Sequence, residues 1–398
     1  MIADVPIREI VTPATLDDAA QVMRASAAHG ASVAFMGGGT GLGFGNPPER
    51  VDVLLRTEKL ARVVEYAPPD QVITVEAGLT LAALQSILGA ENQRLALDAP
   101  CAERATVGGL LATNGYGPLR TRFGMLRDLI VGISLVRADG VLVRGGGKVV
   151  KNVAGFDLPK LMVGSNGTLG LIATATFRLH PLPEARERWV TAARSLLELR
   201  NLCRAILDRR LEPSAVVAFG ETTGYGLHVL FEGFGAGVES QSARLRELAR
   251  DLLGAETRVE HAGEASLNAL DESARTFGTV RLRLSTPPAF TPSLDEILAP
   301  LRAAYREARV VLYPTVGASF VGGFPGDADR FVVAVERARA ASEAAGGNLI
   351  VMDCAEPAIR ERLDVFGAPP GSFPIMRRLK ERFDPDRRLN PGRFVGGL

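Results

Sequence analysis

The chain has 398 residues, of which 46% are hydrophobic and 23% charged, and its formal net charge is +1. This length exceeds one ordinary core, so we expect two domains. The near-zero charge argues against a general attraction to nucleic acid or to an anionic membrane. Three widely spaced cysteines without a CxxC pair offer neither a zinc site nor an iron–sulfur cluster, and they fit a reducing cytoplasm. We find no signal-peptide layout and no stretch of the ~20 apolar residues that a transmembrane segment requires.

The first 180 residues alternate predicted helices and strands. Thr15 is a plausible N-cap for the first helix, and Asp139-Gly140 is a strong hairpin turn. The uncharged stretch 161–177 is too short to span a bilayer, so we predict a buried turn and strand there. The predicted helices are 17–28 and 80–88, the predicted strands are 33–36, 51–55, 72–76 and 171–179, and the predicted hairpin is 130–144.

Pro181-Leu182-Pro183 interrupts this pattern and marks a predicted domain boundary. Beyond it the chain runs β-α-β-β-α-β twice, which is a ferredoxin-like order, and we expect one antiparallel sheet covered by helices. The predicted strands are 188–194, 214–220, 226–233 and 257–260, then 279–285, 309–314, 316–321 and 348–353. The helices between them are 195–209 and 238–253, then 293–307 and 327–345. We therefore predict domains at 1–183 and 184–370, followed by a structured tail at 371–398.

A glycine-rich segment, GGGTGLG, follows the strand at 33–36 directly. Glycines remove the Cβ atoms, so backbone N–H groups can close on an anion such as a pyrophosphate. The segment is not a Walker loop, because no Gly-Lys-Ser/Thr follows, and it lacks the GxGxxG spacing of a dinucleotide-binding fingerprint. Taken alone, it is equally well explained as a tight turn.

Two further segments have the same character. ATVGGLLATNGYG at 105–117 is rich in small residues, and it offers Thr106 and Asn114 as hydrogen-bond donors. KNVAGFDL at 151–158 precedes GSNGTLG at 164–170. Each segment alone is compatible with a packed helix start or a turn.

Together, in this order and spacing, the three segments resemble the FAD-binding family that includes vanillyl-alcohol oxidase and para-cresol methylhydroxylase. Within that family the chain is similar to the smaller, FAD-binding flavin subunits of bacterial glycolate oxidases. The resemblance covers about 180 N-terminal residues and resumes at the tail, Asn390-Pro391-Gly392-Arg393. It implies an α+β fold, with a two-part FAD-binding domain and a cap domain that has an antiparallel sheet.

The resemblance also implies roles for single positions. The glycine loop would wrap the FAD pyrophosphate, the second segment would follow the ribityl and diphosphate, and the backbone of Gly170 and Ile172 would meet the adenine end. The tail would return to the isoalloxazine, where Arg393 or Lys151 could stabilise negative charge at the N1–C2=O edge; a solvated surface lysine is the alternative for Lys151. The implied cofactor-binding residues are Gly37, Gly38, Gly39, Thr40, Gly41, Pro100, Thr106, Gly108, Gly109, Ala112, Asn114, Gly115, Gly117, Lys151, Gly170, Ile172, Asn390 and Arg393.

Departures from the family bear on how FAD is attached. Many relatives link FAD covalently to a histidine in the first glycine loop, which contains none here. Another branch uses a cysteine two residues before Thr-Val-Gly, whereas Cys101 lies five residues before Thr106. We therefore predict non-covalent FAD, and we predict that Cys101 is a buried small side chain.

Other departures bear on catalysis. Larger relatives that oxidise D-2-hydroxy acids carry a cap metal site with the segment Gly-Asp-Gly-Asn-Leu-His, whereas this chain has Gly-Gly-Asn-Leu-Ile, with Ile350 in place of the histidine. The four histidines are His29, His180, His228 and His261, and their spacing suggests no pair of metal ligands. No Ser-His-Asp set or pair of carboxylates stands out, so we assign no metal ligand and no catalytic residue.

The resemblance implies an FAD-dependent oxidoreductase that acts on CH–OH donors, with hydride transfer from a hydroxylated carbon of a small 2-hydroxy acid. It also implies a complex with a larger flavin subunit and an iron–sulfur subunit. We expect a cytoplasmic location, with peripheral attachment to the inner membrane through partners as an alternative. A stand-alone FAD enzyme acting on another alcohol and a non-catalytic, FAD-holding subunit both remain open at this point.

Overall fold

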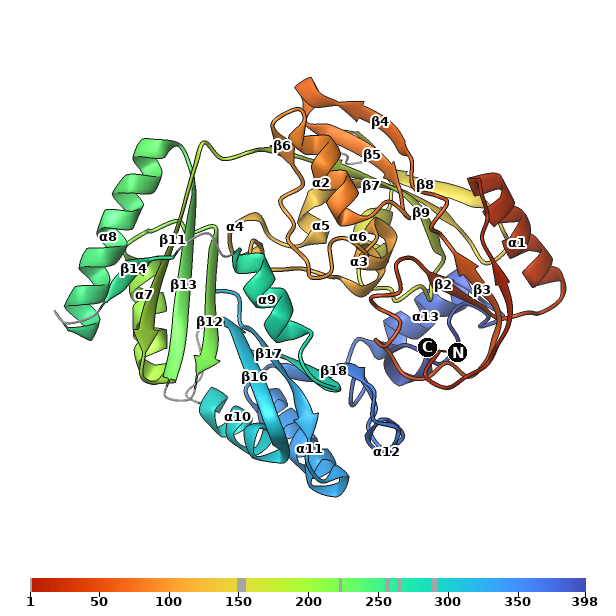
Figure 1. Cartoon of the computed structure of the whole chain (residues 1–398). Helices are drawn as coiled ribbons and strands as arrows, with labels where there is room; N and C mark the ends of the chain where they lie inside the picture. The colour runs from red at the N-terminus through yellow and green to blue at the C-terminus, as the bar shows by residue number, and fades with distance from the viewer. Residues whose placement is uncertain (1, 149–154, 222–223, 255–257, 263–265, 288–292) are drawn as a thin grey trace. The chain divides into compact units, whose positions relative to one another are not determined.

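The computed structural model describes residues 2–148, 155–221, 224–254, 258–262, 266–287 and 293–398. The chain divides into two compact units (Figure 1). The first comprises Met1–Tyr116, Gly124–Leu182 and Ala368–Leu398, and the second comprises Gly117–Phe123 and Pro183–Gly367. Within the described residues, no helix has both the length and the apolar character needed to cross a membrane.

A small parallel sheet begins the first unit. β1 (Ile7–Val11) and β2 (Val33–Met36) both pair in parallel with β3 (Val51–Arg56), which lies between them. Helix α1 (Leu16–Ala28) connects β1 to β2. The predicted N-cap is confirmed: the Thr15 hydroxyl accepts from the Asp18 amide at 3.1 Å, and the Asp18 carboxylate accepts from the Thr15 amide at 3.0 Å.

A five-stranded sheet forms the other part of the first unit, and its strand pairs are all antiparallel. It contains the predicted hairpin, which turns at Gly140, and the predicted strand after Gly170. Its strands in spatial order are β4 (Val63–Ala67), β5 (Val72–Glu76), β9 (Leu171–Arg178), β7 (Ile130–Val136) and β8 (Leu142–Gly146).

One apolar core joins the two sheets of the first unit. Met23 of α1, Leu55 of β3, Val136 of β7 and Ala173 of β9 all belong to it, each with no exposed surface. Leu389, from the C-terminal tail, is fully buried in the same core. The tail is therefore part of the folded unit, as the sequence led us to expect of a structured end.

Short elements complete the first unit. They are α2 (Leu81–Gly89), the two-stranded sheet of β6 (Gln93–Arg94) and β10 (His180–Pro181), α3 (Val107–Thr113), α5 (Leu126–Leu129), α6 (Leu158–Met162), α13 (Phe373–Phe383) and the 3-10 turns Pro68–Asp70 and Val395–Gly397. Cys101 lies between β6 and α3; contrary to our prediction it is half-buried, and it adopts a positive φ of 60°.

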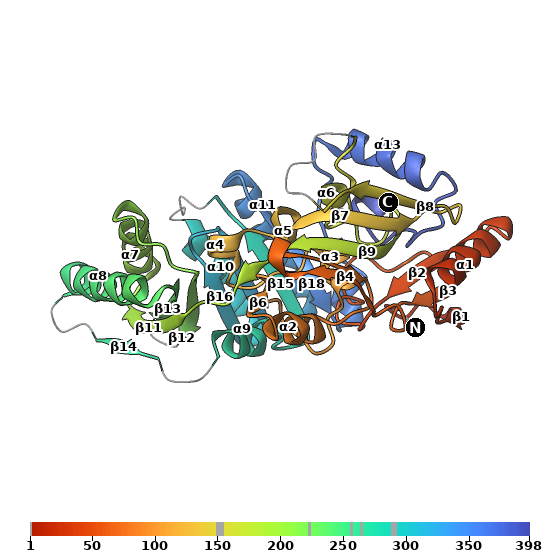
Figure 2. The same ribbon diagram turned by 90° about the horizontal axis from the view of Figure 1, so that it is seen from above.

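The second unit contains one eight-stranded sheet in the order β14-β11-β13-β12-β16-β17-β15-β18 (Figures 1 and 2). The first half consists of β11 (Ala185–Ala193), α7 (Leu196–Asp208), β12 (Ala215–Glu221), β13 (Gly224–Gly233), α8 (Gly235–Leu253) and β14 (Val259–His261). The second half consists of β15 (Val280–Ser285), α10 (Ser293–Ala304), β16 (Tyr305–Tyr313), β17 (Ala318–Pro325), α11 (Ala328–Ala344) and β18 (Asn348–Cys354).

This arrangement confirms the expected single antiparallel sheet, and it shows how the two halves join. The second strands of the two halves, β12 and β16, pair antiparallel, with Phe219 opposite Val311. Trp189 of β11 donates to Ser242 of α8 at 2.8 Å, which fixes that helix on one face of the sheet. The other face carries Arg188 and His228, whose Nη1 and Nδ1 lie 3.0 Å apart.

Three helices of the second unit were not predicted from the sequence. They are α9 (Leu267–Arg275), α12 (Pro357–Arg360) and the single turn α4 (Arg120–Phe123). α9 packs on β16 and β17, where the Tyr313 hydroxyl donates to the Asp271 carboxylate at 2.6 Å. The single turn α4 lies in a segment that we had placed in the first domain, but Arg122 donates to the Glu212 carbonyl at 3.3 Å within the second unit.

Candidate functional site

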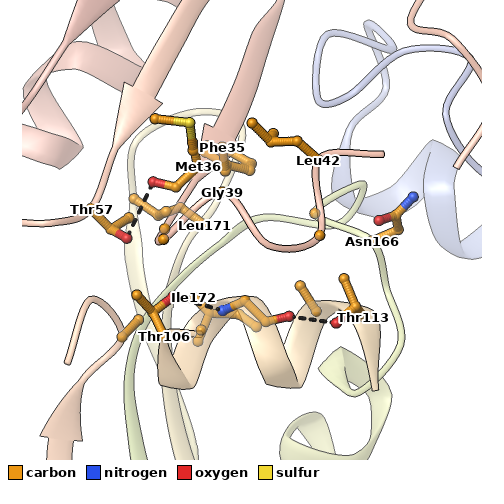
Figure 3. Close-up of a pocket in the computed structure, with 18 of the residues that line it drawn as sticks. Phe35, Met36, Gly39, Leu42, Thr57, Thr106, Thr113, Asn166, Leu171 and Ile172 are labelled. Carbon is orange, nitrogen blue, oxygen red and sulfur yellow. Dashed lines mark hydrogen bonds between the residues drawn. The ribbon is translucent and has the colours of Figure 1, made fainter. Parts of the chain in front are cut away.

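A pocket opens inside the first unit, between the glycine loop that follows β2 and the short helix α3 (Figure 3). The space outside the protein atoms there, open solvent included, is about 740 Å³. Its lining comes from segments that are distant in the sequence: the loop after β2, the start and middle of α3, the turn before β9, and the tail. The lining residues are Phe35, Met36, Gly37, Gly38, Gly39, Thr40, Gly41, Leu42, Thr57, Ala77, Thr106, Gly108, Gly109, Ala112, Thr113, Asn166, Gly167, Gly170, Leu171, Ile172, Asn390 and Arg393.

Two different structural features explain why glycine occupies positions of the loop. A Cβ atom on Gly38 would overlap the backbone carbonyl of Arg104, and one on Gly37 would overlap the Thr106 side chain. Gly39 differs, because its φ is +77° and the nearest atoms to an added Cβ are 3.9 Å away. Gly37 and Gly38 thus let the loop lie against the segment before α3, and Gly39 supplies a left-handed backbone on the pocket wall.

Helix α3 forms the opposite wall and is held by its own polar residues. Thr106 caps it, with its hydroxyl 3.3 Å from the Gly109 amide, and the Thr113 hydroxyl donates to the Gly109 carbonyl at 2.8 Å (Figure 3). Gly108 lies against Ala77, where an added Cβ would be 2.7 Å from the alanine Cβ. Small residues therefore let this helix pack closely against the residue that follows β5, and they leave few side-chain atoms projecting into the pocket.

The tail and the turn before β9 close one side of the pocket together. Asn390 donates through Nδ2 to the Asn166 carbonyl at 2.8 Å, and its amide donates to the Val33 carbonyl at 2.9 Å. Asn166 and Gly167 have φ values of 50° and 70°, and Asn390 has 44°. Asparagine and glycine are the residues that adopt this left-handed backbone most readily, so the sequence fits the turn that the pocket requires.

A buried ion pair anchors the tail. Lys380 is 2% exposed and its ammonium donates to Asp384 at 2.6 Å, to the Leu389 carbonyl at 2.8 Å and to the Thr168 carbonyl at 3.0 Å. Asp384 is fully buried and also accepts from the amides of Arg388 and Leu389. This network joins α13 to the turn before β9 and directs the next residues into the pocket.

Arg393 is the charged side chain of the pocket wall. It is 4% exposed, and its Nη2 donates to the Leu42 carbonyl at 2.8 Å and also to the Phe44 carbonyl. Burial lowers the pKa of Arg393 to about 10, so the guanidinium stays protonated at neutral pH. The wall therefore combines backbone that can meet an anion with a fixed positive charge, which fits a phosphate-bearing cofactor.

The structure brings most of the implied cofactor-binding residues to this pocket. The residues that line it are Gly37, Gly38, Gly39, Thr40, Gly41, Thr106, Gly108, Gly109, Ala112, Gly170, Ile172, Asn390 and Arg393. Pro100, Asn114 and Gly115 lie outside the lining, Gly117 belongs to the second unit, and Lys151 lies outside the described residues. Asn114 instead ends α3 in a left-handed conformation, which is a structural reason for an asparagine there.

Sequence reasoning missed other residues of the wall. Phe35 and Met36 belong to β2, and Thr57 follows β3, so they meet the pocket through the parallel pairing of these strands. Asn166 and Gly167 lay within a segment that we had singled out, and their turn-forming residue types were the available signal. Leu42, Ala77, Thr113 and Leu171 had no such signal, because an apolar or small side chain looks the same in a core as on a pocket wall.

Comparison with known proteins bears on the cofactor of the chain. Residues 7–146 match a family described as the FAD binding domain. These residues therefore resemble an FAD-binding domain. The match includes the glycine loop and α3, and FAD is accordingly the cofactor of the chain.

Several relatives of known name are similar to part or nearly all of the chain. The D-lactate dehydrogenase of Archaeoglobus fulgidus is 36% identical over 43% of this chain and 38% of its own length. The glycolate oxidase subunit GlcE of Escherichia coli is 35% identical over 38% of this chain and 42% of its own length. An FAD-linked oxidoreductase of Mycobacterium tuberculosis is 24% identical over 96% of this chain and 90% of its own length. The chain thus spans about two fifths of the length of the first two of these relatives.

Solved structures agree on the fold. p-Cresol methylhydroxylase superposes with a TM-score of 0.77 at 16% identity, covering 96% of this chain and 88% of its own. Alkyldihydroxyacetonephosphate synthase superposes with a TM-score of 0.71 at 16% identity, covering 97% of this chain and 77% of its own. These values confirm the expected α+β fold of the vanillyl-alcohol oxidase type, including the second unit with its antiparallel sheet.

Proposed function

We propose that this chain is the FAD-binding subunit of a glycolate oxidase-like complex that oxidises a small 2-hydroxy acid. The observation that carries the proposal is that the relatives of this chain include a D-lactate dehydrogenase, a D-2-hydroxyglutarate dehydrogenase and two glycolate oxidase subunits. The substrates in these names are all acids with a hydroxyl on the carbon beside the carboxylate. A shared FAD-binding domain is most economically explained by shared chemistry on that group.

The reaction is the two-electron oxidation of the hydroxyl-bearing carbon to a ketone or aldehyde. FAD supplies the acceptor for the hydride that leaves this carbon, and the hydroxyl proton passes to a base. Residues of the first unit would hold the cofactor: the loop 37–41 and α3 would face its phosphates, and Gly170, the first residues of β9 and Asn390 line the same pocket. We assign no base, because the described residues that line this pocket include no carboxylate, histidine, lysine, tyrosine or cysteine.

The second unit supports a role in a complex. Ile350, which stands where larger relatives carry a metal-binding histidine, is a 6%-exposed residue of β18 beside Arg283 of β15. An isoleucine side chain cannot coordinate a metal, so this position cannot serve in that way. We therefore propose that a larger flavin subunit supplies the activation of the 2-hydroxy acid, and that an iron–sulfur subunit receives the electrons.

The assay compares the lone chain with the assembled complex. The purified, FAD-loaded chain should reduce a dye negligibly with glycolate or D-lactate, and turnover should appear when the larger flavin subunit is added. Substantial turnover by the lone chain, unaffected by chelators, would instead favour a stand-alone enzyme. Absence of turnover with these acids in the full complex would reject the substrate class.

A second measurement asks whether this flavin takes part in turnover. Gly39→Val should remove FAD from this chain alone, and Gly30→Val is the matched control, because Gly30 also has a positive φ and open space but lies outside the pocket. A complex built with Gly39→Val should lose activity if this flavin carries electrons. Retained activity would show that the chain only holds its FAD. We place the complex in the cytoplasm, with any membrane attachment made through its partners.

A further inference from the structure

Arg393 is a buried cation that no carboxylate among the described residues neutralises. Two of its three guanidinium nitrogens, Nε and Nη1, form no hydrogen bond to any described residue, and Nε is completely buried. Its Nη2 meets two carbonyl oxygens, which carry only partial charge. Another buried arginine of the tail, Arg388, differs in that its Nε lies 3.8 Å from the Asp386 carboxylate. A buried charge without a counter-ion is strongly unfavourable, so Arg393 requires an anion from outside the chain.

The position of the guanidinium indicates which part of FAD supplies that anion. Arg393 donates to the carbonyl of Leu42, which lies in the glycine-rich segment GGGTGLG, and both residues line the same pocket. Oxidised FAD carries its negative charge on the pyrophosphate, whereas the isoalloxazine edge gains charge only on reduction. A permanently charged and buried guanidinium is matched by a permanently charged partner.

We infer that Arg393 is the counter-charge of the FAD pyrophosphate, and that the tail thereby closes over the phosphates of the cofactor. This assignment differs from the role at the isoalloxazine edge that the family resemblance implies for the same residue. It depends on FAD as the cofactor and is independent of which acid is oxidised. In the apoprotein the tail carries an uncompensated charge, so FAD binding and the ordering of the tail should be coupled.

The test measures ligand affinity of the full-length apoprotein by calorimetry, for wild type, Arg393→Met and Arg393→Lys. The probes are FAD, ADP and adenosine; ADP carries the diphosphate without the flavin, and adenosine carries neither. Arg388→Met is the matched control, because it also removes a buried tail arginine that donates to backbone carbonyls but does not line the pocket. The midpoint reduction potential of the bound flavin is measured on the FAD-loaded forms.

The inference predicts that Arg393→Met raises the Kd of both FAD and ADP by a similar factor, about 10- to 150-fold, the usual worth of a charged hydrogen bond. The adenosine Kd and the midpoint potential should stay at their wild-type values. Arg393→Lys should recover most of the ADP affinity, because it restores the charge. Arg388→Met should lower the melting temperature and leave the ADP affinity unchanged.

Two results would overturn the inference. Unchanged ADP affinity with a lowered midpoint potential would place the guanidinium at the isoalloxazine edge. An equal loss of affinity for adenosine and ADP, with no recovery in Arg393→Lys, would show that the residue only supports the shape of the pocket. Neither result bears on the substrate class, which the dye-reduction assay tests separately.

Discussion

Replacing Lys380 with methionine should destabilise the first unit strongly. The ammonium uses all three of its N–H groups, on Asp384, Thr168 and Leu389, and no water-exposed surface is available to either member of the ion pair, whose side chains are 2% and 0% exposed. Lys380→Met leaves the Asp384 carboxylate buried with only two backbone amides as partners. Removing one member of a buried pair typically costs about 3–5 kcal/mol, a large part of the total stability of a domain.

The size of this loss should depend on pH in a defined way. A stranded carboxyl can avoid carrying a buried charge by taking up a proton, and this costs about 1.4 kcal/mol for each pH unit above its ordinary pKa of about 3.9. Protonation therefore limits the loss of unfolding free energy caused by the buried charge to about 4 kcal/mol at pH 7 and about 1.5 kcal/mol at pH 5. Lys380→Met should therefore be less destabilised, relative to wild type, at pH 5 than at pH 7, by about 2–3 kcal/mol.

Urea unfolding of wild type and variant at both pH values measures this difference. Lys160→Met is the matched control, because Lys160 pairs with Asp157 on the surface with 46% of its side chain exposed, and its loss should change stability by less than about 1 kcal/mol. The double variant Lys380→Met/Asp384→Asn should regain stability at pH 7, since the amide carries no charge. A loss below about 1 kcal/mol in Lys380→Met, or a loss independent of pH, would refute the reasoning.

Three further predictions concern the cofactor and the second unit. Gly39→Val should lose FAD and Gly30→Val should retain it. Both positions have a positive φ and open space around an added Cβ, but of the two only Gly39 lies on the pocket wall. Equilibrium dialysis with FAD measures this, and equal retention by the two variants would contradict the pocket assignment. Acid precipitation should leave the yellow colour in the supernatant, since FAD is predicted to be non-covalent, and a flavin-bearing peptide in the pellet would show the opposite. Burial, with a smaller contribution from Arg188, lowers the pKa of His228 from 6.5 to about 4. The unfolded state therefore binds the proton more tightly than the folded state, and the free energy of unfolding should fall as the pH drops from 6.5 to about 4. His228→Gln should flatten that part of the stability profile, by at most about 1.4 kcal/mol per pH unit, whereas His29→Gln, which replaces an exposed histidine, should keep the wild-type slope.

Much of the local structure follows from local sequence signals. Strands β2 and β5 have the predicted bounds, and α1 begins one residue before the predicted start, because a capping threonine and apolar periodicity are properties of neighbouring residues. The double β-α-β-β-α-β order was predicted for the same reason. Edge strand β1 was missed, since three of its five residues are exposed and it shows no alternation of apolar and polar residues.

Features that depend on contacts between distant segments could not be predicted from local sequence signals. Helices α9 and α13 were not predicted from the sequence, because each buries only a few residues and these include the charged side chains of Asp271 and Lys380. The pairing of β12 with β16, which makes one sheet from two halves, joins residues about 90 positions apart and leaves no trace in either segment alone.

The sequence by itself indicated a glycine-lined site for FAD, because the order and spacing of its glycine, threonine and asparagine residues resemble those of an FAD-binding family. Only the tertiary structure decided what completes that site. Arg393 and Asn390 reach the pocket because Leu389 is buried in a core built from the other end of the chain and because Lys380 and Asp384 hold the turn before it. Burial depends on which segments meet in space, so the same arginine could equally have been a solvated residue of a loose end, and its unmatched charge became visible only in the folded chain.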